Sequence, residues 1–150
     1  MGITSNPVKA IVFDFDGTLM DSVTGLLGEA FVPGAKEFVE QYSGQILFFI
    51  SSAASQQKLE SILEREKWSK HFKKVYGSST PKTQALIEIL EDYDLHKNEL
   101  LFVGDGFRDN SVAIEVGCPF VGVAREGQQF PQAIAHIQNL LELRDILQLK

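Results

Sequence analysis

Four short apolar runs are the clearest feature of the hydrophobic pattern along this chain. Each run is nearly uninterrupted rather than alternating with polar positions, which is typical of strands that are covered on both faces. The runs are Ala10–Phe13, Ile46–Ile50, Leu100–Val103 and Phe120–Val123, with a weaker candidate at Val75–Gly77. The pattern therefore predicts a set of buried, parallel strands.

Apolar residues recur at helical spacing in the segments between these runs. The predicted helices cover residues 33–42, 55–67, 81–93 and 110–116, and one or two more are expected within 131–149. Strands that alternate with helices predict an α/β fold with a central, mostly parallel sheet and helices on both faces. We expect one domain over residues 1–150, with its core at about 8–125 and a C-terminal helical segment at about 131–149.

Two carboxylates, Asp14 and Asp16, follow the first apolar run and precede Gly17. Side chains two apart on a strand share a face, so both acids are expected to crowd one place at the end of that strand. Like charges raise each other's cost of ionisation, and a divalent cation between them would offset this cost. The alternative is that this segment forms only a polar turn.

The ends of other predicted strands also carry polar residues. Ser51 and Ser52 follow the second run, Asp105 and Asp109 follow the third, and Lys82 lies in the first turn of a predicted helix. The carboxyl ends of parallel strands meet at one edge of a sheet, where open α/β sheets bind ligands. Carboxylates suit a hard cation, and a hydroxyl and an ammonium group suit phosphate. The combination indicates phosphoryl transfer, which needs positioning and charge neutralisation.

Composition narrows the class of protein. The chain is 44% hydrophobic and 23% charged, which is ordinary for a globular domain. Its net charge of −6 argues against non-specific nucleic-acid binding. The single cysteine, Cys118, allows no internal disulfide and fits a reducing compartment. Since the sequence shows neither a signal-peptide profile nor a membrane-length apolar run, we expect a cytoplasmic protein that does not bind a membrane.

The polar features, in this order, resemble the motifs of the haloacid dehalogenase (HAD) superfamily of phosphohydrolases. Asp-Phe-Asp-Gly-Thr-Leu-Met-Asp-Ser at 14–22 is similar to the first motif, and Gly-Asp-Gly-Phe-Arg-Asp at 104–109 is similar to the fourth. Ser51 matches the second motif and Lys82 the third. The resemblance covers about residues 8–125 and looks closest to the phosphoglycolate phosphatase branch. It implies the three-layer α/β/α, Rossmann-like fold of that superfamily.

The resemblance also implies catalytic roles. Asp14 would be the nucleophile that forms an aspartyl-phosphate. Asp16 would protonate the leaving oxygen and then activate water for hydrolysis of the intermediate. Lys82 would stabilise the phosphoaspartate.

The implied cofactor is Mg²⁺, with Asp14, Asp16, Asp105 and Asp109 as its candidate ligands. Asp16 would bind through its backbone carbonyl. Asp109 would bind through water, or would instead orient Lys82.

Substrate binding is assigned to Ser51, Thr18 and Arg108. Ser51 would bind the transferring phosphoryl group, and Arg108 is the favoured candidate for a second anionic group, ahead of Arg125 and Lys36. Simpler explanations stay open at this point. Ser51 could cap the following helix, and Thr18 could be a turn residue.

The two remaining motif residues have alternatives of the same kind. Asp109 could cap its own helix. Lys82 could be an exposed lysine at a helix start, although a helix N-terminus disfavours cations.

Superfamily members usually cover the site with a cap domain. Here the segments between Ser22 and Ser51 and between Ser51 and Lys82 are too short to hold one, and residues 23–32 could form only a small flap. A capless site must exclude water by other means. Either a large substrate or a neighbouring copy of the chain in a homo-oligomer is expected to supply the missing lid.

The sequence thus predicts a Mg²⁺-dependent phosphomonoester hydrolase acting through an aspartyl-phosphate. The expected substrate is a small phosphorylated metabolite or an accessible macromolecular phosphate. The alternative is a catalytically weak or inactive HAD-like module with an interaction or regulatory role. A dehalogenase is disfavoured, because hydrolysis of a carbon–halogen bond needs neither Asp16 nor a metal.

Overall fold

A six-stranded parallel sheet forms the centre of the computed structural model, which describes residues 7–21, 30–124, 130–131 and 134–149. The strands lie in the order β5–β4–β1–β6–β7–β8, and every neighbouring pair runs parallel. Their bounds are β1 Ala10–Phe13, β4 Leu47–Ser51, β5 Lys74–Tyr76, β6 Leu100–Gly104, β7 Phe120–Val123 and β8 His136–Ile137.

Strand β1 lies inside the sheet and marks the point where the direction of the chain changes. After β1 the chain adds β4 and β5 on one side of it, and then adds β6, β7 and β8 on the other. The carboxyl ends of β1 and β6 therefore flank the topological switch point of the sheet. Ligands of open α/β sheets bind at such a point, because the connections leave in opposite directions and open a crevice there.

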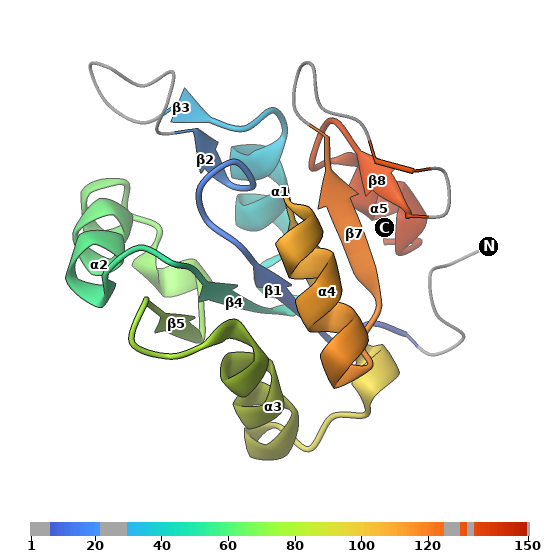
Figure 1. Ribbon diagram of the computed structural model, residues 1–150. Helices are drawn as coiled ribbons and strands as arrows, with labels where there is room; N and C mark the ends of the chain where they lie inside the picture. The colour runs from blue at the N-terminus through green and yellow to red at the C-terminus, as the bar shows by residue number, and fades with distance from the viewer. Residues whose placement is uncertain (1–6, 22–29, 125–129, 132–133, 150) are drawn as a thin grey trace.

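Helices cover both faces of the sheet (Figure 1). Helices α1, α2 and α5 pack with Ile11 and Phe13 in one core, and α3 and α4 pack with Ala10 and Val12 in the other. Successive residues of β1 alternate between the two cores because strand side chains point to opposite faces. The helices are α1 Ala35–Tyr42, α2 Gln56–Arg65, α3 Lys82–Asp92, α4 Phe107–Val116 and α5 Glu142–Ile146, with short 3₁₀ turns at Ser69–His71 and Lys97–Glu99. The result is the predicted three-layer α/β/α architecture.

The predicted strands are confirmed, and the weaker candidate at Val75–Gly77 corresponds to β5. The four predicted internal helices are also present, although α4 begins at Phe107 rather than at residue 110. Of the one or two helices expected within 131–149, the described residues contain one, α5, together with a strand that the sequence did not predict. Strand β8 extends the sheet and only α5 is helical, because Ile137 is buried as part of a strand paired to β7. Short apolar segments do not distinguish strand from helix by periodicity alone.

A small antiparallel hairpin follows β1. It pairs β2 (Met20–Asp21) with β3 (Ala30–Phe31), and it lies beyond the carboxyl end of β1 (Figure 1). Most of the flap predicted at 23–32 falls at residues 22–29, outside the described residues.

The sheet edge at β5 is closed by a side chain. The Nε2 group of Gln56, at the start of α2, donates to the carbonyl oxygen of Val75 at 2.8 Å, and its Oε1 accepts from the backbone N–H of Gly77 at 2.7 Å. The amide thereby pairs backbone groups that an edge strand otherwise leaves open to other chains. A Cβ at Gly77 would lie 2.5 Å from the backbone nitrogen of Gln56, so the close approach requires glycine.

We expect Gln56→Ala to lower the free energy of unfolding by about 1–2 kcal/mol, because two part-buried hydrogen bonds are lost. Urea denaturation followed by circular dichroism would measure this. Gln57→Ala is the matched control, since residue 57 is exposed on the same helix, and should change stability by less than about 0.5 kcal/mol. Equal effects of the two substitutions would contradict the edge-closing role.

Candidate functional site

Three carboxyl groups converge at the carboxyl edge of the sheet. Asp14 directly follows β1, Asp105 directly follows β6, and Asp109 lies in the first turn of α4. One carboxylate oxygen from each residue lies within 4.8 Å of the other two. Asp14 and Asp109 are buried and Asp105 is partly buried. Because like charges this close disfavour each other's ionisation, the cluster requires positive charge.

Lys82 provides the positive charge nearest to the cluster. Its Nζ donates a hydrogen bond to Oδ1 of Asp109 at 2.7 Å and lies 3.2 Å from Oδ1 of Asp14. Lys82 is the first residue of α3, where the helix dipole disfavours a cation. The carboxylates outweigh that effect, so the explanation of Lys82 as a merely exposed lysine is wrong. The backbone N–H of Phe15 also donates to Oδ1 of Asp14, at 2.8 Å.

Burial and mutual repulsion shift the ionisation of this cluster. Burial raises the pKa of Asp14 to about 8, and the charge of Asp109 adds to this shift, while Lys82 and the amide of Phe15 oppose it. The pKa of Asp105 is also raised, first by burial and then by Asp109. Burial acts to lower the pKa of Lys82, but attraction to Asp14 and Asp109 prevails and raises it. Without a further cation, the site therefore holds a proton on its acids at neutral pH.

The carboxylate of Asp16 does not join the cluster. Strand β1 ends at Phe13, and residue 16 lies exposed in the turn that follows. That turn is closed by a hydrogen bond from the N–H of Gly17 to the carbonyl of Met20 at 2.8 Å, and Gly17 adopts a φ of 80°, which favours glycine. The expectation that Asp14 and Asp16 crowd one place is thus wrong, because the two-residue period of a strand does not extend into the turn. Metal binding by the backbone carbonyl of Asp16 stays a prediction.

Two hydroxyl groups at this edge have no hydrogen-bond partner within the described parts of the chain. They are Oγ of Ser51, at the end of β4, and Oγ1 of Thr18, in the turn after β1. Both residues are fully buried. A buried hydroxyl without a hydrogen-bond partner lowers stability by about 1–3 kcal/mol. Such groups in native structures often bind a ligand or a water molecule. Their contact with substrate stays a prediction.

The capping explanations for Ser51 and Asp109 are wrong. Helix α2 is capped by Ser55, whose Oγ accepts from the N–H of Lys58 at 3.2 Å. Gly106 occupies the cap position of α4, and the side chain of Asp109 binds Lys82 instead.

Gly104, the last residue of β6, gives Asp109 the space it occupies. A Cβ at position 104 would overlap the carboxylate of Asp109, with its Cγ 2.7 Å away. Sequence reasoning placed Gly104 in a motif but gave it no function, since only the three-dimensional path of α4 brings residue 109 back against the strand end.

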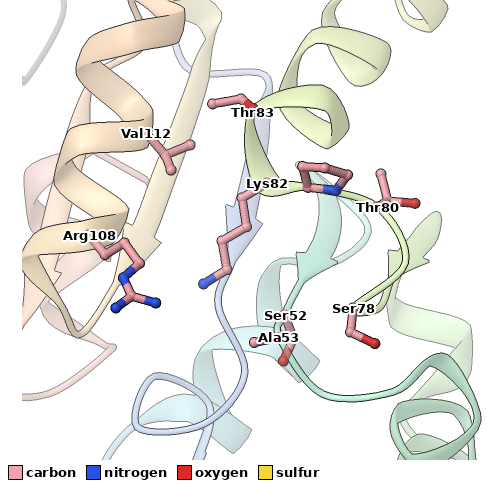
Figure 2. A pocket seen from close by; sticks show the side chains of 9 residues that line it. Ser52, Ala53, Ser78, Thr80, Lys82, Thr83, Arg108 and Val112 are labelled. Carbon is pink, nitrogen blue, oxygen red and sulfur yellow. The ribbon is translucent and has the colours of Figure 1, made fainter.

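A pocket of about 360 Å³ opens beside Lys82 (Figure 2). It is lined by Ser52, Ala53, Ser78, Thr80, Pro81, Lys82, Thr83, Arg108 and Val112. Of the cations considered for a second anionic group, Arg108 lines this pocket, whereas Lys36 lies exposed on α1, on the other face of the sheet. Arg125 lies outside the described residues. The loop residues of the pocket carry no sequence signal, because they follow no periodic pattern.

The sequence model of the family described as haloacid dehalogenase-like hydrolase matches residues 29–123, which is more than half of the chain. The chain belongs to this family. The match includes Ser51, Lys82, Asp105 and Asp109, and Asp14 precedes it. A comparison with curated protein sequences finds no match.

Solved structures of HAD-like hydrolases share this fold at low sequence identity. A HAD-superfamily hydrolase of subfamily IA from Geobacter sulfurreducens aligns with a TM-score of 0.80 at 18% identity, covering 98% of this chain and 100% of its own. A predicted phosphoglycolate phosphatase from Haemophilus somnus gives 0.80 at 15% identity, with 95% and 99% covered. The HAD-hydrolase YfnB from Bacillus subtilis, reported bound to magnesium, gives 0.81 at 13% identity, with 95% and 99% covered.

The HAD-like core seen here has no helix, among the residues the structure describes, that is long and apolar enough to cross a membrane. The short β2–β3 hairpin stands where the sequence left no room for a cap domain.

We expect Asp14→Asn to stabilise the metal-free HAD-like protein at neutral pH. The folded-state pKa of Asp14 is raised to about 8, so the stability contributed by its protonated form is present at low pH and is lost as pH rises toward that value. Asp105 acts in the same direction, whereas the stability that the raised pKa of Lys82 contributes is fully present at neutral pH and is lost only at alkaline pH. Asparagine avoids the cost of ionisation, and we expect a gain of about 1–2 kcal/mol.

The measurement is urea denaturation in a chelator at about pH 5 and about pH 8. The advantage of the variant over the wild type should grow between the two pH values, and added Mg²⁺ should stabilise the wild type more than the variant. If the free energies of unfolding of the wild type and the variant changed equally with pH, the proposed repulsion among the carboxylates would be contradicted.

A second prediction concerns the space beside β6. Gly104→Ala should destabilise the protein by about 1–3 kcal/mol, because the new methyl group overpacks the Asp109 carboxylate. In an Asp109→Ala background the same change should cost little, and a double-mutant cycle measures this coupling. Gly44→Ala is the control, since nothing lies within 4 Å of a Cβ there. Additive effects of the changes at 104 and 109 would show that the glycine serves another purpose.

Proposed function

We propose that this HAD-like hydrolase is a Mg²⁺-dependent phosphomonoester hydrolase that acts through an aspartyl-phosphate on Asp14. The observation that carries the proposal is the meeting of Asp14, Asp105 and Asp109 with Lys82 at the switch point of the sheet. This arrangement concentrates negative charge where a ligand binds, at a cost in stability that packing alone does not explain.

The donor set fits Mg²⁺. All three grouped side chains offer carboxylate oxygens, which are the ligands preferred by this hard cation, and none offers sulfur or imidazole. When bound, the ion would neutralise charge on the carboxylates and on the phosphoryl oxygens. In the proposal, Asp14, Asp105 and Asp109 hold it together with the backbone carbonyl of Asp16.

The shifted pKa of Asp14 explains why the reaction would depend on a cation. A carboxylic acid with a pKa of about 8 is mostly protonated at neutral pH and is then a poor nucleophile. A cation at the cluster favours the ionised form, as Lys82 already does in part. A cation held by these carboxylates would therefore favour the ionised, nucleophilic form of Asp14.

In the first half of the proposed reaction, an oxygen of Asp14 attacks phosphorus. The bond from phosphorus to the ester oxygen breaks, and Asp16 donates a proton to the departing oxygen. Exposure of Asp16 at the turn after β1 suits this task, since its side chain is free to approach the outer side of the phosphoryl group. Lys82 offsets charge on Asp14 and the phosphoryl oxygens.

In the second half, water attacks phosphorus and the ionised Asp16 accepts its proton. The bond between phosphorus and Asp14 breaks, which releases inorganic phosphate and restores the carboxylate. Ser51, whose buried hydroxyl lacks a partner among the described residues, is proposed to donate to a phosphoryl oxygen in both halves.

The proposal also covers the kind of substrate and the way in which water is excluded from the site. A small phosphorylated metabolite is the proposed substrate, because the pocket beside Lys82 holds only about 360 Å³. The small β2–β3 hairpin gives little cover, so a second copy of the chain is proposed to exclude water from the site.

The test is Mg²⁺-dependent release of phosphate from p-nitrophenyl phosphate by purified protein. Asp14→Asn should lower kcat by about 1,000-fold or more, because the nucleophile is lost. The exposed carboxylate of Asp92, at the far end of α3, supplies the control: Asp92→Asn should keep wild-type activity.

The intermediate can be trapped by rapid denaturation with ³²P-labelled substrate. Asp16→Asn should accumulate a hydroxylamine-sensitive phosphoprotein, because hydrolysis of the intermediate loses its base. Wild-type protein that releases no phosphate above the level of Asp14→Asn would overturn the proposed function and favour a non-catalytic module.

A further inference from the structure

The pocket beside Lys82 extends away from the carboxylate cluster, between the start of α3 and the start of α4. Figure 2 shows Arg108 reaching in from α4 and Lys82 from α3, with Ser52, Ala53, Ser78 and Thr80 around the opposite side. Lys82 lines the pocket and also binds two of the clustered acids, so the pocket adjoins the place where the phosphoryl group is proposed to bind. The pocket would then hold the part of the substrate that is attached to the phosphoryl group.

The charged side chains that line this pocket are cations. Its lining includes Lys82 and Arg108 and no acidic side chain. The first turns of α3 and α4 also face it, and neither helix has a side-chain hydrogen bond at its cap. Helix N-termini carry partial positive charge, which adds to the charge of Arg108, whereas the charge of Lys82 is already offset by Asp14 and Asp109. An anionic group is the ligand chemistry that this surface favours.

Arg108 is the cation that remains available for such a group. Lys82 is engaged with Asp14 and Asp109. In contrast, Arg108 is exposed and has neither a hydrogen bond nor an ion pair with any residue in the described segments. Its neighbour Asp109 points the other way, into the cluster, because successive residues of a helix diverge by about 100°. A guanidinium group is suited to bidentate binding of a carboxylate or phosphate.

The walls of the pocket limit what lies between the two anionic groups. Ala53, Pro81 and Val112 provide apolar surface, and the hydroxyls of Ser52, Ser78 and Thr80 lie around it. A volume of about 360 Å³ is near the small end of the range for ligand pockets. A short carbon chain with one or two oxygens fits these walls, whereas a folded phosphoprotein does not fit inside them.

We propose that this pocket binds the leaving group of the substrate, and that Arg108 selects compact phosphomonoesters whose leaving group ends in a second anion. This inference rests on the proposed phosphatase function. The second anion is a carboxylate or a phosphate, since both present oxygens that match the guanidinium group. Arg108 is then a specificity-determining residue that does not touch the reacting phosphorus.

Binding can be tested without turnover by isothermal titration calorimetry of the full chain with Mg²⁺. Butylphosphonate, 4-phosphonobutanoate and propane-1,3-diphosphonate carry the same propyl chain and end in methyl, carboxylate and phosphonate groups. One or both anionic ligands should bind wild-type protein about 10–100-fold tighter than butylphosphonate, as expected for charge-assisted hydrogen bonds. Which of them binds tighter identifies the second anion.

Variants of Arg108 link this preference to the residue. Arg108→Gln should reduce the preference to less than about 3-fold, and Arg108→Lys should retain part of it as a point charge. Arg144→Gln removes the same charge from an exposed site on α5, on the other face of the sheet, and should leave the preference at the wild-type value. Thermal denaturation would verify that each variant is folded.

The corresponding esters give the kinetic readout: propyl phosphate, 3-(phosphonooxy)propanoate and propane-1,3-diyl bisphosphate. The ratio of kcat/KM for an anionic ester to that for propyl phosphate should fall about 10–100-fold in Arg108→Gln. Equal binding of all three phosphonates by the wild type, or a preference that survives Arg108→Gln, would overturn this inference. Hydrolysis of no ester, with the binding preference intact, would overturn the proposed function alone.

Discussion

Repulsion among three clustered carboxylates, two buried and one partly buried, is the constraint on which the rest of this site depends. Asp14, Asp105 and Asp109 lie close enough to share one ion, and burial raises the pKa of Asp14 to about 8. Lys82 offsets only part of this charge. The protein thus stores an unfavourable interaction at the centre of its sheet, and a cation that relieves it also ionises the proposed nucleophile. Stability and function are opposed here, as is common in active sites.

The fold makes this concentration of charge tolerable. Two well-packed cores lie on either side of the sheet, and the acids occupy only its carboxyl edge, at the point where the chain changes direction. Gly104 lets the carboxylate of Asp109 lie against the end of β6. The helix that carries Lys82 begins there too, so the cation is positioned by backbone geometry rather than by a flexible loop.

Two cations at the start of two helices are proposed to have different roles because their surroundings differ. Lys82 lies among acids and is already paired, which suits it to stabilise charge near the reacting group. Arg108 faces a pocket without acids and is unpaired within the described residues, which suits it to recognise a ligand. If the proposals hold, this HAD-like core places specificity in the helices beside the proposed phosphate site.

The sequence by itself determined five strands of the sheet, their parallel direction and the residues at their ends, because uninterrupted apolar runs and turn residues are local signals. Ser51, Lys82, Asp105 and Asp14 could be chosen on that basis. It misjudged Asp16, since strand periodicity stops at Phe13. It also missed strand β8 within 131–149, since pairing of Ile137 with β7 depends on distant residues. Only the tertiary structure decided that Asp109 completes the acid cluster and that Arg108 faces a pocket. Both depend on how α3 and α4 pack against each other, and no local pattern encodes that packing.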